Sequence, residues 1–343
     1  MSHRMQFRPI FKFILLFANS LHYGCRPLIF CIAILFLNGC NPARRLPEGS
    51  YLLNKNKYKV VDKQEINLNE IAAITTHVPN KRIFDIYRFN LRTYVLFDTK
   101  KEHKFNKWMK KHIGEAPVIL DTVAVNNTIK QIKLYLFNHG YFNAEVTKEI
   151  VVKRKKANVI YLIKANEPYR IKQLTRSISD DNISKLFQHD SSQSLLKIGD
   201  QYQSKLMTQE RERITDRLNK KGYYRFSKEF ITFSIDTNLN CNCININTII
   251  QDPIQSNKDT VFYGKHIPYR IRNIIINPNF NPLQPNETCP DSLTYAIEPA
   301  SGGNIIFIHN HNLAYSPRIM VSYLSFKPGD LYNLNNVNRT YTR

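Results

Sequence analysis

Apolar residues recur at helical spacing in two segments of similar length in the middle of the chain. Each segment is followed by a glycine, Gly140 or Gly222, at the place where a left-handed residue ends a helix and reverses the chain. The positions that would share one helix face are Val125, Ile129, Ile132 and Leu136 in the first segment, and Met207, Ile214 and Leu218 in the second. The pattern therefore predicts two equivalent helices, each with a glycine cap. Shorter helical patterns precede them at residues 67–76 and 81–97.

Segments rich in β-branched and aromatic residues follow each glycine, which is typical of strands. After Gly140 they cover residues 141–152 and 159–164, and the basic residues 153–156 join them in a turn. The corresponding segments after Gly222 are residues 223–235 and 243–251. Polar and apolar residues alternate in the last of these, which indicates a sheet with one solvated face.

Two short motifs recur with the helices and indicate a modular array. Tyr-Arg-Ile occurs at residues 169–171 and 269–271, and Gly-Asp-x-Tyr at residues 199–202 and 329–332. A Gly-acidic pair at Gly114-Glu115 is the candidate counterpart upstream of the first helix. The order within a unit is strand, helix, helix, strand, strand, so we expect an α+β fold with the helices on one face of a small mixed sheet.

The repeats predict where the modules begin and end. Module 1 would cover residues 50–167, module 2 residues 168–266, and an incomplete module 3 residues 267–343, with its helix cut off near Arg343. Residues 277–303 are rich in Pro and Asn, and we expect them to form a long loop.

The first 39 residues carry four basic residues, no acidic residue and an apolar run of about signal-peptide length, from Pro27 to Leu37. That run ends in Leu-Asn-Gly-Cys at residues 37–40, which resembles a bacterial lipobox. Residues 1–39 are therefore interpreted as a signal peptide, Cys40 as the lipid attachment site, and residues 40–49 as a linker. The alternative is a plain N-terminal anchor helix with an incidental cysteine.

The chain of 343 residues has a formal net charge of +22, which suits nucleic acid, an anionic membrane surface or acidic partners without choosing among them. Beyond Cys40 there are three cysteines, so one disulfide could form, with Cys289 joining Cys241 or Cys243; free thiols are the alternative. Neither a second Cys-x-Cys pair nor a third ligand near His309 and His311 completes a metal site. We expect no metal and no cofactor.

The repeated motifs and the sequence that follows Cys40 carry a resemblance. They are similar to the POTRA modules of the BamA/TamA family of outer-membrane assembly proteins, and the start of the chain resembles lipidated TamA-like proteins of Bacteroidetes-type bacteria. The resemblance covers residues 40–343. It implies periplasmic modules that pass unfolded outer-membrane proteins to a C-terminal barrel. The sequence departs from the family there: no long series of amphipathic strands follows, so we expect modules without that barrel.

The resemblance also implies a binding mode, in which an extended client adds a strand to an open sheet edge. The edge would be the strand after the Gly-Tyr-aromatic motif, at about residues 141–146 and 223–230. Its candidate residues are Tyr141, Phe142, Val146, Tyr223, Tyr224 and Phe226. For any one of these aromatic residues, an ordinary core or half-buried position is the alternative.

We expect no enzyme, because the chain contains no Gly-x-Ser-x-Gly, P-loop or His-Glu-x-x-His motif and offers no catalytic residues. The leading hypothesis is a lipid-anchored array at the outer membrane, facing the periplasm. Its partners would be unfolded outer-membrane proteins, assembly-complex subunits and, through Cys40, membrane lipid. An exported protein would meet no nucleic acid. Two alternatives remain, a basic nucleic-acid-binding protein with an N-terminal anchor and a cell-envelope lipoprotein or adhesin of unknown partner.

Overall fold

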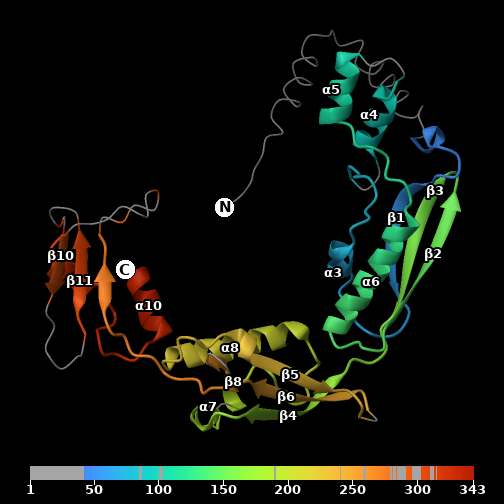
Figure 1. Ribbon diagram of the computed structural model, residues 1–343. Coiled ribbons are helices and arrows are strands. Elements are labelled where there is room, and N and C mark those ends of the chain that lie inside the picture. The colour runs from blue at the N-terminus through green and yellow to red at the C-terminus, as the bar shows by residue number, and fades with distance from the viewer. Residues whose placement is uncertain are drawn as a thin grey trace, which may run out of the picture. The chain divides into compact units, whose positions relative to one another are not determined.

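The computed structural model describes residues 42–343 apart from residues 85–86, 100–102, 189–190, 240, 258–259, 279, 281–282, 284–290, 296–302, 310–312 and 314. The predicted signal peptide and Cys40 lie outside the described residues. Contacts divide the chain into two units, which are described separately (Figure 1). Unit 1 holds the residues up to Tyr135 together with Ala144–Ala165. Unit 2 holds Leu136–Asn143 and Asn166–Arg343.

Unit 1 is built on a three-stranded mixed sheet in the order β1-β3-β2. The strand β1 (Leu52–Val60) pairs in parallel with β3 (Lys156–Lys164), which pairs antiparallel with β2 (Glu145–Lys153). Buried and half-buried positions alternate along β3, as expected of a central strand with one face against a core. The helix α6 (Thr122–Asn138) lies beside this sheet, and Lys148 of β2 donates a hydrogen bond to its Asn126 (Figure 1).

The described part of unit 1 also contains three shorter helices. They are α3 (Leu68–Ile74), α4 (Phe89–Phe97) and α5 (Lys104–His112). The 3-10 turn η1 (Pro42–Arg45) packs on α4, where Ala43 and Leu46 join a buried cluster with residues of β1 and α4. The helical pattern predicted at residues 81–97 is correct only for α4. Phe84 has a φ of +51°, which a right-handed helix does not allow.

Unit 2 repeats the same sheet with shorter connections. The strand β4 (Arg170–Ile178) pairs in parallel with β6 (Cys243–Ile250), which pairs antiparallel with β5 (Ile231–Asp236). The helices α7 (Asp181–Phe187) and α8 (Ser204–Lys220) precede β5. The 3-10 turns η2 (Ser191–Gln193) and η3 (Lys228–Phe230) lie in the connections.

One core joins the helices α7 and α8 to the sheet of β4, β6 and β5. Residues of α7, α8, β5 and β6 form a single buried cluster, so the two helices share one face of the sheet. Its members are Ile183, Phe187, Ile214, Leu218, Tyr223, Phe226, Ile231 and Ile250. The predicted fold class, α+β with helices on one face of small mixed sheets, is confirmed.

The end of the chain departs from the predicted plan. A third sheet has the order β10-β11-β9, in which β9 (Ile274–Ile276) is parallel to β11 (Ile305–His309) and β10 (Asp291–Tyr295) is antiparallel to it. The helices α9 (Pro317–Ser322) and α10 (Leu334–Tyr341) follow. Residues 277–303 therefore contain a strand, where the sequence predicted only a long loop. The pairing of β10 with β11 is a tertiary contact, and the Pro and Asn around it hide it from the local sequence.

A separate hairpin, β7 (Ile254–Asn257) with β8 (Thr260–Tyr263), lies between the second and third sheets in the sequence. Among the residues that the structure describes, no helix combines the length and the apolar character that a membrane span requires.

Candidate binding surfaces

The helices α6 and α8 end in the same way. Each has 17 residues and is followed by a glycine with positive φ, +84° at Gly140 and +101° at Gly222. The next residue donates back into the helix, from Tyr141 N to Leu136 O over 2.9 Å in the first case. This is the predicted left-handed cap. We call these two segments, residues 140–142 and 222–224, the glycine termini.

Within unit 2, the first glycine terminus binds at the beginning of β4. The carbonyl of Gly140 accepts the N–H of Tyr169 over 2.8 Å, and the Tyr169 carbonyl accepts the N–H of Tyr202 over 2.9 Å. The Phe142 ring centroid lies 4.9 Å from that of Tyr169 and 5.1 Å from that of Tyr202. A Cβ at Gly140 would stand 2.9 Å from the Tyr202 carbonyl oxygen, so this position needs glycine for space as well as for φ.

The second glycine terminus makes the same contacts one module later. The Gly222 carbonyl accepts the Tyr269 N–H over 2.8 Å, and the Tyr269 carbonyl accepts the Tyr332 N–H over 2.9 Å. The Tyr224 ring lies 4.9 Å from the Tyr332 ring, edge to face. A Cβ at Gly222 would meet the Leu331 Cδ1 atom at 2.7 Å. The two arrangements have the same hydrogen bonds, so the repeated motifs form one structural arrangement that occurs twice.

The surface that receives each glycine terminus is held together by its own hydrogen bonds, from a backbone N–H and from an arginine side chain. Ile171 N donates to Asp200 O over 2.9 Å, and the Arg170 guanidinium donates to Gly199 O over 2.9 Å. The same two bonds, at the same lengths, occur at Ile271 and Arg270. We call residues 169–171 with 199–202 acceptor site 2, and residues 269–271 with 329–332 acceptor site 3. The Tyr-Arg-Ile and Gly-Asp-x-Tyr motifs thus build these sites.

The six side chains predicted for the strand-addition edge are placed in three ways. Four of them are buried: Val146 within β2, and three that lie outside the strands, Tyr141, Tyr223 and Phe226. Tyr223 and Phe226 are members of the core shared by α7, α8 and the sheet. Tyr141, Tyr223 and Phe226 therefore have the ordinary core position that was the alternative for these residues.

Phe142 and Tyr224 lie against acceptor sites 2 and 3, and only Val146 lies in a strand, near the start of β2. The strand predicted from residue 223 begins only at Ile231, because the glycine cap is followed by a turn and by η3. The predicted edge at residues 223–230 is therefore not extended. The extended edge lies just after it, in β5.

Each of the first two sheets has two outer strands, β1 and β2 in the first and β4 and β5 in the second, with no further strand beside them among the described residues. In β5 the backbone groups can be assigned to the two sides. Gln251 N donates to Phe230 O over 2.8 Å, and Thr232 and Ser234 follow at intervals of two in the same register. Alternation therefore directs the N–H groups of Phe233 and Ile235 away from β6, toward the open side.

The outer strands β2 and β5 differ in charge. Charged residues recur along β2 (Glu145, Lys148, Glu149 and Lys153), a composition that discourages strand addition. The strand β5 reads Ile-Thr-Phe-Ser-Ile-Asp and contains no lysine and no proline. The alternation of apolar and polar residues in β5 can be seen in the sequence. Together with the pairing of β5 and β6, this alternation predicts the position of the edge.

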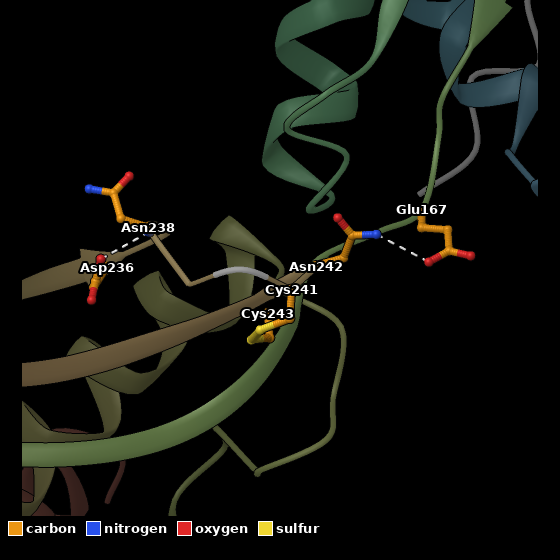
Figure 2. Close-up of a disulfide and its surroundings, with 6 residues drawn as sticks. All are labelled: Glu167, Asp236, Asn238, Cys241, Asn242 and Cys243. Atoms are coloured by element: carbon orange, nitrogen blue, oxygen red, sulfur yellow. Dashed lines mark hydrogen bonds between the residues drawn. A yellow bond between two sulfur atoms is a disulfide. The ribbon is translucent and has the colours of Figure 1, made fainter.

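A disulfide joins Cys241 and Cys243 at the beginning of β6, within unit 2 (Figure 2). The sequence-based pairing of one of them with Cys289 is therefore wrong; Cys289 itself lies outside the described residues. Figure 2 shows Asn242, between the two cysteines, pointing toward Glu167, whose carboxylate it bonds over 3.1 Å. The Asn242 carbonyl accepts the Arg170 N–H over 3.1 Å, which links the loop to acceptor site 2.

Unit 2 contains a buried carboxylate, Glu210 on α8, which accepts bonds from Arg213, Ser194 and the Leu195 N–H. Burial alone would raise the pKa of Glu210, but these donors outweigh it and hold that pKa below its ordinary value. Its bonds are all internal, so its role is structural. No group of three His, Cys, Asp or Glu side chains that could hold a metal occurs in the described part of the chain.

Unit 1 concentrates basic side chains around β1. Arg82 and Arg88 both donate to the Asn54 carbonyl, and burial together with the nearby Arg82 lowers the pKa of Arg88 to about 10. Burial and neighbouring arginines, Arg88 first, also lower the pKa of Lys156. Part of the positive charge of the chain therefore lies around β1.

No family model and no curated protein matches the chain. Among solved structures, the chain is similar to the POTRA3-5 region of Haemophilus influenzae BamA, with 11% identity, 86% of each chain covered and a TM-score of 0.34. It is also similar to POTRA1-3 of the periplasmic domain of Anabaena Omp85, with 9% identity, 86% of each chain and a TM-score of 0.32. For the N-terminal domain of Thermosynechococcus elongatus Omp85 the identity is 8%, the coverage 87% of this chain and 86% of that chain, and the TM-score 0.29. Identities and TM-scores this low do not show that the chain belongs to the family of these proteins.

Proposed function

We propose that this protein is a lipid-anchored array of POTRA-like modules, residues 50–167, 168–266 and 267–343, at the outer membrane. It faces the periplasm and binds unfolded outer-membrane proteins or assembly-complex subunits by strand addition. The observation that carries the proposal is the open edge of β5, where Phe233 and Ile235 direct N–H groups away from the sheet. Such binding needs no catalytic residue.

The β5 edge suits clients of varied sequence. Backbone N–H and C=O groups supply the affinity in strand addition, so the client needs an extended conformation and few particular side chains. The length of β5, six residues, sets the length of client strand that can pair. The edge lacks the lysines that keep other edge strands from pairing, which favours a binding role.

A matched pair of variants tests the role of the β5 edge. Ile235→Pro and Ile235→Ala both remove the half-buried side chain, but only the proline removes the outward N–H, and edge strands tolerate proline at such positions. With a photo-crosslinking residue at the exposed Ser234, we expect nascent outer-membrane proteins to crosslink to the wild type and to Ile235→Ala. Ile235→Pro should lose most of this crosslinking.

Equal crosslinking by the proline and alanine variants would contradict strand addition at β5. Absence of any crosslink to outer-membrane proteins in the wild type would favour an envelope lipoprotein or adhesin with another partner. A photo-crosslinking residue at Thr208, exposed on α8, is the positional control and should give little product.

The anchoring part of the proposal depends on Cys40 and needs its own test. In cells fed a labelled fatty acid, the wild type should carry the label and Cys40→Ala should not. The Cys40→Ala protein should also keep its leader, because cleavage follows lipidation in this class of protein. Unchanged labelling and processing would remove the lipoprotein assignment while leaving the β5 edge untouched.

A further inference from the structure

Unit 1 contains a third copy of the acceptor surface, which its sequence does not reveal. Leu53 N donates to Val118 O over 2.8 Å, and Leu120 N donates to Tyr51 O over 2.8 Å. Leu52 and Ile119 form a bridge between these bonds. The same bonds and bridge define acceptor sites 2 and 3 at Ile171, Tyr202 and Arg170 and at Ile271, Tyr332 and Arg270. We call residues 51–53 with 118–120 acceptor site 1.

The correspondence also identifies the residue of unit 1 that takes the place of the glycine in the Gly-Asp pairs. Pro117 stands where Gly199 and Gly329 stand in the other two sites, directly before Val118. Those glycines donate an N–H to the first strand over 2.7 Å, and proline has no N–H, so this one bond is lost. Gly114-Glu115 is therefore not the counterpart of the Gly-Asp pairs.

Acceptor site 1 differs from the others at the atom that receives a glycine terminus. Tyr169 N and Tyr269 N each donate to a glycine carbonyl, but Tyr51 N donates to no atom among the described residues. The Tyr51 and Ile119 side chains are 38% and 39% exposed beside it. Acceptor site 1 thus has an available donor at the position where both of its copies are occupied.

We propose that acceptor site 1 binds a partner protein through a helix that ends in a left-handed glycine followed by an aromatic residue. The two occupied copies in this same chain show what such an occupant looks like. Its glycine carbonyl would accept the Tyr51 N–H, and its aromatic ring would pack on Tyr51 and Leu120. Nothing in this inference depends on strand addition at β5.

The side chains of acceptor site 1 indicate which occupant it prefers. In acceptor site 2 the Gln201 amide donates to His139 O, on the helix side of the bound terminus. Ile119 takes the place of Gln201 and cannot donate a hydrogen bond. In acceptor site 3 that place is taken by another apolar residue, Leu331, whose Cδ1 atom would lie 2.7 Å from a Cβ at Gly222. Acceptor site 1 therefore resembles site 3, and the segment around Gly222 is the best matched probe.

The test uses the full chain and a fluorescent peptide that copies residues 204–226 of its own sequence. We expect saturable binding by fluorescence anisotropy, weakened about tenfold or more when the peptide carries Gly222→Ala, because a Cβ meets the site and a hydrogen bond is lost. Ile119→Asp in the protein should weaken binding to a similar degree. Val61→Asp, another exposed apolar residue of unit 1, is the matched control and should bind as the wild type does.

Amide hydrogen exchange of the wild type locates the bound peptide without a variant that might fail to fold. The peptide should slow exchange of the Tyr51 N–H, while the Leu53 and Leu120 N–H groups, already bonded, should change little. The proposal is overturned if the peptide does not bind, if Tyr51 exchange is unchanged, or if Ile119→Asp binds as the wild type does. The last result would mean that the peptide displaces the internal terminus at acceptor site 3.

Discussion

Two basic residues, Arg154 and Lys155, form the turn between β2 and β3, with φ values of +50° and +58°. A two-residue hairpin turn of this kind requires positive φ at both central positions, which Asn and Gly adopt at lowest cost. The sequence predicted the turn from its charge and its place between two strands. It did not predict the backbone conformation, because Arg and Lys are rarely found with positive φ.

Replacing Arg154-Lys155 by Asn-Gly should stabilise unit 1. Each residue relieved of a left-handed conformation contributes about 1 kcal/mol, so we expect a gain of about 1–2 kcal/mol in the free energy of unfolding. Chemical denaturation measures it. The matched control is Ala-Ala, which removes the same two charges but keeps the Cβ atoms; an equal gain in the control would attribute the effect to charge and contradict the prediction.

Glu210 gives unit 2 a dependence on pH. Its pKa is lowered in the folded protein, so the stability it contributes is present above the ordinary value of 4.5 and is lost as the pH falls through the lower, folded pKa. Glu210→Gln should cost about 1–3 kcal/mol at neutral pH, because Arg213 and Ser194 lose a charged acceptor. The difference from the wild type should shrink in acid.

Thermal unfolding followed between neutral pH and about pH 3 measures this difference. The control is Glu212→Gln, which removes an exposed carboxylate from the same helix and should have little effect at any pH. A Glu210→Gln penalty that stays constant across the pH range would show that the carboxylate's charge does not stabilise unit 2.

At the scale of elements, the glycine termini and the acceptor sites explain why three short motifs repeat together. The helix pattern and the glycine caps could be predicted from the sequence, because the 3.6-residue period and the left-handed residue are local features. The partner of each glycine could not, because Tyr169 and Tyr202 reach Gly140 only after β4 and the loop before α8 have folded. Acceptor site 1 could not be predicted from the sequence, because it has the same hydrogen bonds as sites 2 and 3 but different side chains.

Gly222→Ala tests whether contact, and not only φ, fixes the glycine termini. Gly199 also has positive φ, +92°, but a Cβ there would meet nothing within 4 Å, so Gly199→Ala reports the backbone cost alone, about 1–2 kcal/mol. Gly222→Ala adds the overlap with Leu331 and should cost clearly more. Equal losses on denaturation would mean that Leu331 moves aside freely and that the contact has little weight.

At the scale of the whole molecule, the first two sheets share one plan and the third does not. The sequence predicted the shared plan, because β1 and β4 are each followed by helices and then by two strands. In the third sheet β10 and β11 precede the helices, and β10, which pairs with β11, lies in the segment that the sequence predicted as a loop. The strand predicted at residues 223–230 begins instead at Ile231, because a turn and η3 follow Gly222.

We propose that an extended client pairs with the open side of β5. Amide hydrogen exchange of the wild type measures this pairing directly. An unfolded outer-membrane protein fragment is added, and exchange is followed residue by residue along β5. We expect slower exchange at Phe233 and Ile235 and little change at Thr232 and Ser234, which already bond to β6. Binding of the fragment without slower exchange at Phe233 and Ile235 would contradict it.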